Sequence, residues 1–217
     1  MPRESFHSQM DRMDREVQAM ADLARDMLHG GLSALESMDR AKAQEVIAKA
    51  DGLAGYDEAI ETTALGLLTL QAPVARDLRH IGAVLKLITY INRVGRYGYD
   101  IARVVEFMPQ LSQPLNLVSQ RQMAANVERM LEMVLDAFRT RKSPDAQAIL
   151  RLEDDVDAQR HAIQREALTY MMQDARNIEP YANVMMVARY LERCGDNIVK
   201  MAEKLHYAAT GQRIILN

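Results

Sequence analysis

The sequence predicts an all-α protein of six long helices, arranged as two tandem three-helix bundles. Residues that favour helices dominate the 217-residue chain, which has 15 Met but only 10 Gly and 6 Pro, and aromatic residues make up 5% of it. Apolar residues recur at alternating spacings of three and four, the period of a helix that buries one face. The chain also repeats part of its pattern about 100 residues later. Together these observations indicate a helical bundle with an internal repeat.

Breaks in the apolar pattern divide the chain into six segments. They fall at Gly30–Gly31 and Ser37–Arg40, at Ala72-Pro73, at Pro109–Pro114, at Ser143-Pro144 and at Asn177–Pro180. We therefore expect helices near residues 4–36, 40–70, 74–107, 115–141, 145–173 and 178–208, followed by an irregular tail from Gly211 to Asn217.

Each of the six segments has its own support. The first and the last carry the most regular apolar series, which are Met10, Met13, Val17, Met20, Ala24, Met27 and Val184, Val187, Leu191, Cys194, Ile198, Met201, Leu205. The second and the fourth carry weaker series, which are Val46, Leu53, Ile60, Ala64, Leu67 and Met123, Val127, Met130, Val134, Ala137. The third and the fifth are supported by the internal repeat.

The third and sixth predicted helices repeat one pattern at an offset of 100 residues. They share Tyr, Arg and Gly, in Tyr90, Arg93, Gly95 and in Tyr190, Arg193, Gly195. Their apolar positions also correspond, except that Gly98 stands where the sixth helix has Ile198. The second and fifth helices correspond at an offset of 103 residues, from Val46 with Ile149 to Ile60 with Ile163. We therefore expect one three-helix unit in residues 1–110 and a second in residues 111–217.

Charge and composition exclude several classes of function. With 27 basic and 30 acidic residues the formal net charge is -3, which gives no electrostatic reason to expect a nucleic acid or an acidic lipid as the main partner. The single Cys194 excludes an internal disulfide and a Cys-x-x-Cys zinc site. Residues 1–16 are too charged for a secretory signal, and the nearly uncharged run 59–75 contains Glu61 and Pro73, so we expect no membrane span. No nucleophile triad or Gly-rich phosphate loop is visible, and we expect no enzymatic activity.

Four carboxylates in the second unit are the candidate site for chemistry. Glu153 and Asp157 are four residues apart in the fifth predicted helix, and Glu192 and Asp196 are four apart in the sixth, so each pair shares one helix face. If the two faces meet, the repulsion among the carboxylates would be relieved by a cation such as Mg, Mn, Ca or iron. The alternative is an acidic face that is simply solvated.

Three segments resemble the PhoU family. The run from Tyr190 to Ile198 looks like the helix-six signature of PhoU proteins, the run from Gln71 to Arg79 resembles the start of the family's third helix, and Glu153 to Asp157 resembles its acidic motif in helix five. These segments follow the family's order and span nearly the whole chain.

The resemblance implies a metal site in the second unit only. In the PhoU family, acidic motifs in each unit hold a metal ion or cluster; here they carry over to Glu153, Asp157, Glu192 and Asp196, with Glu203 as a fifth candidate because the family has an acidic residue there. The ion would be divalent or trivalent, such as iron, Mn, Mg or Zn. The counterparts in the first unit are Ala50, Ala54, Asn92 and Arg96. We expect no metal there, and we interpret Asp51, Asp57 and Glu61 as ordinary surface residues.

The resemblance also implies a function. It predicts a cytoplasmic, non-enzymatic regulator of phosphate homeostasis, an adaptor between the ATPase of the phosphate ABC transporter and a phosphate-sensing signalling protein, which damps phosphate uptake when phosphate is plentiful. We expect a homodimer that binds no nucleic acid and is at most peripheral to a membrane.

Two alternatives remain open from the sequence. One is a ferritin-like di-iron carboxylate protein, which needs Glu-x-x-His motifs; the chain has Glu4-x-x-His7 and Glu203-x-x-His206. The other is a metal-free helical scaffold in which the many Met fill the core and the acidic quartet is a coincidence. His161 continues the spacing of Glu153 and Asp157, but we interpret it as a solvated surface residue.

Overall fold

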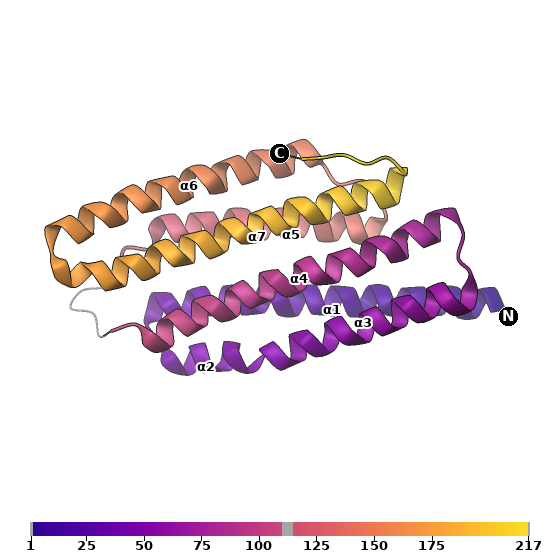
Figure 1. Cartoon of the computed structure of the whole chain (residues 1–217), viewed down its shortest axis with the longest axis horizontal. Helices are drawn as coiled ribbons and strands as arrows, with labels where there is room; N and C mark the ends of the chain where they lie inside the picture. Colours follow the sequence, from indigo (N-terminus) through magenta and orange to yellow (C-terminus); the bar gives the residue numbers. More distant parts are fainter. Residues whose placement is uncertain (1, 110–114, 217) are drawn as a thin grey trace.

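The computed structural model describes residues 2–109 and 115–216, and these contain helices and no strand. The predicted all-α fold is confirmed. Figure 1 shows an elongated molecule whose long helices lie side by side along its long axis. The helices are α1 Pro2–Ser37, α2 Arg40–Ala48, α3 Ala50–Gln71, α4 Ala75–Phe107, α5 Val118–Thr140, α6 Ala146–Gln173 and α7 Ile178–Thr210, and a short 3₁₀ turn, Ala175–Asn177, precedes α7.

The predicted ranges agree with these helices in all but one place. The range 40–70 is divided into α2 and α3 at Lys49, whose N–H bonds to the carbonyl of Val46, three residues back, at 3.1 Å. This tighter turn interrupts the α-helical hydrogen bonding. Lys49 nevertheless keeps helical dihedral angles (φ -75°, ψ -13°).

Polar caps and left-handed residues explain several helix ends. The Asp39 carboxylate accepts hydrogen bonds from the backbone N–H groups of Ala41 (2.9 Å) and Lys42 (3.1 Å) at the start of α2. Asp145 does the same for Ala148 (3.0 Å) at the start of α6. At the end of α7, Gly211 has φ 78° and its N–H bonds to the Tyr207 carbonyl, which terminates the helix.

The helices pack as two groups that share one core. Helices α1 to α4 contact one another, α5 to α7 contact one another, and the two groups meet mainly along α4 and α7. The apolar series predicted from the sequence is buried, and the buried side chains of both groups form one continuous cluster. The predicted division at residue 110 falls in 110–114, outside the described residues, and it stays a prediction.

Helices α1 and α4 approach each other closely at Gly98. A Cβ atom at this position would lie 2.4 Å from the carbonyl carbon of Met27 and 2.5 Å from the backbone nitrogen of Leu28, closer than atoms can pack. At the corresponding position of α7, Ile198 is fully buried by other side chains. The one exception in the internal repeat therefore marks a backbone contact that only the first group of helices makes.

Candidate metal site

The four predicted ligands lie on the two helices that the sequence placed them on, and they influence one another. Glu153 and Asp157 belong to α6, Glu192 and Asp196 belong to α7, and these two helices pack together. Burial raises the pKa of Glu153 above its ordinary value, and the negative charges of Asp157 and Asp196, with smaller contributions from Asp154 and Glu192, raise it further. The site is therefore a cluster of negative charges, and this cluster disfavours the ionised form of Glu153.

Two arginines neutralise part of this charge. Arg160 Nε lies 3.1 Å from Glu192 Oε1, although the N–H is not aligned well enough for a hydrogen bond, and Arg193 Nη1 donates to Asp196 Oδ2 at 2.9 Å. In this arrangement no group of three or more His, Cys, Asp or Glu side chains is placed to hold one ion, within residues 2–109 and 115–216. A bound ion would have to replace the arginines at Glu192 and Asp196.

The chemistry of the donor set suits a hard cation. All four groups are carboxylates, which are the ligands that Mg²⁺, Mn²⁺ and iron accept readily. Burial raises the pKa of Glu153 most, and the like charges nearby raise it further; a cation would relieve the repulsion among these charges. The chemistry of Glu153, Asp157, Glu192 and Asp196 therefore suits a metal ion, although their side chains would have to leave the arginines and move together to hold it, and the site stays a prediction.

Glu203 is engaged elsewhere. Its side chain is only 8% exposed, and its Oε1 atom accepts hydrogen bonds from Lys200 Nζ at 2.8 Å and from the backbone N–H of Leu216 at 3.0 Å. These contacts tie the tail after α7 back onto the helix, which accounts for a buried carboxylate without any metal. His161 is exposed on α6, as expected from the sequence.

A groove runs beside the predicted ligands. It has a volume of ≈ 720 Å³ and is bordered by Glu153 and Asp196 on one side and by residues of α4 on the other. Basic and aromatic side chains also line it, together with Leu216 of the tail and the less polar Leu150 and Val199: Tyr90, Arg93, Tyr97, Arg193 and Lys200. The sequence did not indicate this groove, because it is formed by the packing of α4 against α7.

The corresponding region of the first group differs in charge. Asn92 and Arg96 stand where α7 has Glu192 and Asp196; Asn92 lies near enough to Asp57 to affect its pKa, and the Arg96 guanidinium lies over the Tyr99 ring at 4.5 Å. Asp57 is not the ordinary surface residue that we expected: one of its carboxylate oxygens is buried without a hydrogen-bond partner in the described part of the chain. Burial and then Glu61 raise the pKa of Asp57, and Asn92 lowers it.

None of the helices that the structure describes is long and apolar enough to cross a membrane.

The chain is similar to a family of known proteins over both groups of helices. The family model described as the PhoU domain matches residues 17–105 and 121–205. A "Phosphate-specific transport system accessory protein PhoU homolog" of Clostridium acetobutylicum is 29% identical over the full length of both chains, and one of Caulobacter vibrioides is 31% identical over 97% of this chain and 92% of its own.

Solved structures agree with this relationship. The crystal structure of PhoU from Pseudomonas aeruginosa superposes with a TM-score of 0.84 at 28% identity, covering 95% of this chain and all of that one. The phosphate transport system regulatory protein PhoU from Streptococcus pneumoniae, at 24% identity, shares the fold with a TM-score of 0.85 over 97% of this chain and all of its own. The chain belongs to the PhoU family.

Proposed function

We propose that this protein is a non-enzymatic regulator of phosphate homeostasis. It acts as an adaptor between the ATPase of the phosphate ABC transporter and a phosphate-sensing signalling protein, and it damps phosphate uptake when phosphate is plentiful. The observation that supports this most is the family match over both groups of helices, together with full-length relatives named as accessory proteins of the phosphate-specific transport system. In this proposal the protein works in the cytoplasm as a homodimer.

The regulatory role is tested by deleting the gene and measuring phosphate uptake and the phosphate-starvation response in phosphate-rich and phosphate-poor medium. We expect uptake to stay high, and the starvation response to stay on, in rich medium. A pulldown from phosphate-replete cells should recover the transporter ATPase or a phosphate-sensing protein. An unchanged response in both media would contradict the adaptor role.

The metal site is the second part of the proposal. Glu153, Asp157, Glu192 and Asp196 would hold one divalent or trivalent ion on the face of α6 and α7, and the ion would neutralise the clustered carboxylates and fix the two helices relative to each other. The support is that these residues lie close enough for the negative charges to add to the effect of burial, which raises the pKa of Glu153. The first group, with Asn92 and Arg96 at the equivalent positions, would bind no metal.

A metal titration tests this asymmetry. We compare the wild-type protein with the double variant Glu192→Ala/Asp196→Ala and with Asn92→Ala, using the metal content after purification and calorimetric titration with Mn²⁺, Mg²⁺ and ferrous iron. Because affinity rises with the number of charged ligands, the double variant should lose the ion and Asn92→Ala should keep it. Equal metal content in all three proteins would contradict the site and would favour the metal-free scaffold.

The ferritin-like alternative is not favoured by the contacts. Glu203 bonds to Lys200 and to the tail, and Nδ1 of His206 lies 2.9 Å from the Ser143 hydroxyl, so this Glu-x-x-His pair is engaged by the protein itself. His7 is exposed on α1, and the side chain of Glu4 falls outside those that the structure describes. Oxidation of ferrous iron by the purified protein would revive this alternative.

A further inference from the structure

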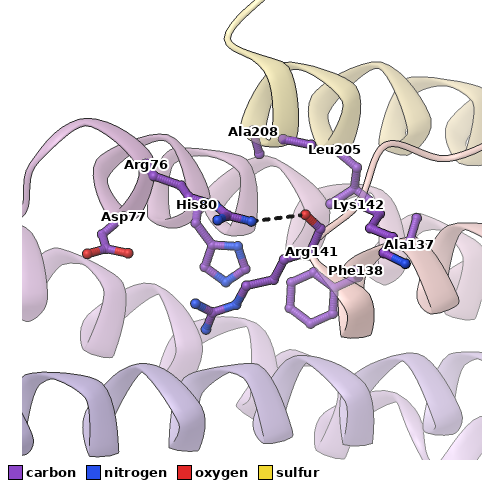
Figure 2. A pocket seen from close by; sticks show the side chains of 10 residues that line it. Arg76, Asp77, His80, Ala137, Phe138, Arg141, Lys142, Leu205 and Ala208 are labelled. Carbon is purple, nitrogen blue, oxygen red and sulfur yellow. Dashed lines mark hydrogen bonds between the residues drawn. The ribbon is translucent and has the colours of Figure 1, made fainter.

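A second cluster of charged residues, this one mainly basic, lies at the N-terminal end of α4. Three helix ends meet there: the start of α4 contributes Arg76 and His80, the end of α5 contributes Arg141 and Lys142, and α7 closes the pocket with Ala208. Figure 2 shows Arg76 reaching across to the Arg141 carbonyl oxygen, at 3.5 Å. The pocket therefore joins the two groups of helices, and none of the predicted metal ligands lines it.

The interior wall of this pocket is held in place by a buried polar network. Asp14 of α1 lies between two partners: its Oδ1 is 2.7 Å from His80 Nε2, and its Oδ2 accepts a hydrogen bond from Arg141 Nη2 at 2.9 Å. The His80 ring also stacks on Phe138, with centroids 5.5 Å apart and planes 15° apart. Because the His80 side chain is only 8% exposed, this network fixes the position of Arg141 before any ligand arrives.

The mouth of the pocket carries positive charge without a partner carboxylate. Arg76 and Lys142 are exposed, and neither forms an ion pair with an acidic side chain in the part of the chain that the structure describes. Asp77 also lines the pocket, but its carboxylate points away from the Arg76 guanidinium in Figure 2. Arg76 donates to the Arg141 carbonyl, and Arg79 Nε donates to the carbonyl of Ala208, so both of these backbone oxygens, which would repel an anion, have a positively charged partner. The positive charges of Arg76 and Lys142 repel each other, and a bound anion would offset this repulsion.

The shape of the pocket limits the size of the ligand. Its enclosed part measures ≈ 20 Å³, room for about one oxygen-sized group. A tetrahedral oxyanion would place one oxygen inside and leave its other oxygens at the mouth, where Arg76 and Lys142 would donate charge-assisted hydrogen bonds. A larger or uncharged ligand would have neither the space nor the matching donors.

We propose that this pocket is an oxyanion-binding site, in which Arg76 and Lys142 recognise a phosphoryl-type group beside Arg141, whose guanidinium is already bound to Asp14. Free inorganic phosphate and a small phosphate monoester offer the same chemistry, and the pocket's donors do not distinguish between them. The guanidinium group of Arg76 is suited to bidentate contacts with such oxygens, and the ammonium group of Lys142 adds a second positive charge.

Calorimetric titration of the purified full-length protein at constant ionic strength tests the site. The probes are inorganic phosphate, sulfate and glycerol 3-phosphate. The variant Arg76→Gln/Lys142→Gln should bind phosphate at least about tenfold more weakly, because it loses two charge-assisted hydrogen bonds. The control Lys42→Gln/Arg129→Gln removes the same charge from exposed positions on α2 and in the middle of α5, and it should bind as the wild type does.

Each outcome decides the question. Binding of phosphate or sulfate that the pocket variant weakens and the control variant does not supports the site; binding of glycerol 3-phosphate alone supports it with a monoester as ligand. Equal weakening in both variants would show that only overall charge matters and would overturn it. So would the absence of heat and of any rise in melting temperature with all three probes at millimolar concentration. Because the measurement uses the isolated protein, a negative result would leave the regulatory role proposed above untouched.

Discussion

The two groups of helices share one repeat but use it to make different contacts. In the first group, α4 lies so close to α1 that Gly98 has backbone atoms where a side chain would be, whereas Ile198 in α7 is fully buried among side chains. One turn earlier, a Cβ atom at Gly95 would clash with Leu53 and lie close to Ala24. A Cβ atom at its counterpart Gly195 would meet its neighbours only at ordinary contact distance. The repeat therefore preserves which face of a helix is buried, but not how near the neighbouring helix comes.

The polar contacts differ in the same way. By the offsets of 103 and 100 residues, Asp57 and Asn92 correspond to Arg160 and Glu192. The second group thus has an ion pair between α6 and α7, while the first has a half-buried carboxylate near a neutral amide. In the first pair the carboxylate is on the earlier helix, α3, and in the second pair it is on the later helix, α7. A sequence repeat of apolar positions is compatible with opposite charge arrangements on the faces beside them.

The largest expected effect comes from giving Gly98 a side chain. Gly98→Ala would force Cβ into the backbone of Met27 and Leu28, so we expect a loss of more than about 3 kcal/mol in the free energy of unfolding, measured by urea titration. The matched change in the second group, Ile198→Val, removes one buried methylene and should cost about 1 kcal/mol. A Gly98→Ala variant as stable as the wild type would show that α1 and α4 can separate freely.

The equivalent glycines Gly95 and Gly195 should respond with opposite signs. At Gly95 a new Cβ would lie 2.5 Å from Leu53 Cδ2 and 3.3 Å from Ala24 Cα, so Gly95→Ala should destabilise the protein by about 1–3 kcal/mol. At Gly195 the nearest atoms are 3.7 Å away, so Gly195→Ala should gain up to about 1 kcal/mol from its higher helix propensity. The midpoints of urea unfolding report both changes, and a loss at Gly195 would contradict the difference in packing.

The smallest effect is expected at Asp57. Its raised pKa means that the folded protein disfavours the ionised carboxylate, so the ionised group destabilises the fold at neutral pH. Asp57→Asn should therefore gain less than about 1 kcal/mol at pH 7. The gain should shrink as the pH falls through the raised pKa and vanish below the ordinary value of 3.8, where the wild-type carboxyl is protonated in both states.

The counterpart Arg160 supplies the control for Asp57. Arg160→Gln would leave Glu192 beside Glu153 without its cation, so it should lower stability at pH 7, by roughly 1 kcal/mol. Unfolding curves measured from pH 3 to pH 8 separate the two variants. If both variants changed the free energy of unfolding in the same direction, this would contradict the exchange of charge between the two pairs that the contacts indicate.

The sequence predicted the helices well, and the reason is local. Apolar periodicity and punctuation by Gly and Pro depend on neighbouring residues only, and they placed every long helix. The break at Lys49 was missed because no residue there marks it; it consists of one shifted hydrogen bond. Gly98 was noticed as an exception, but its cause, the backbone of α1, lies about 70 residues away in the chain.

The candidate sites were predicted only in part. The four carboxylates could be found because they share helix faces at a spacing of four residues. Their arginine partners, the groove along α4 and the engagement of Glu203 by Leu216 depend on how the helices pack. The basic pocket has no motif of its own either, since Arg76 and Arg141 are 65 residues apart and meet only where three helix ends converge.

The hydrogen bond from the Leu216 backbone to Glu203 also has a practical consequence for experiments. It holds the tail against α7 and places Leu216 in the same groove as Glu153 and Asp196. A polyhistidine tag added after Asn217 would begin next to these carboxylates, and its imidazoles would compete for the very ions to be measured. Metal titrations of this protein should therefore use untagged material or a tag that has been cleaved away.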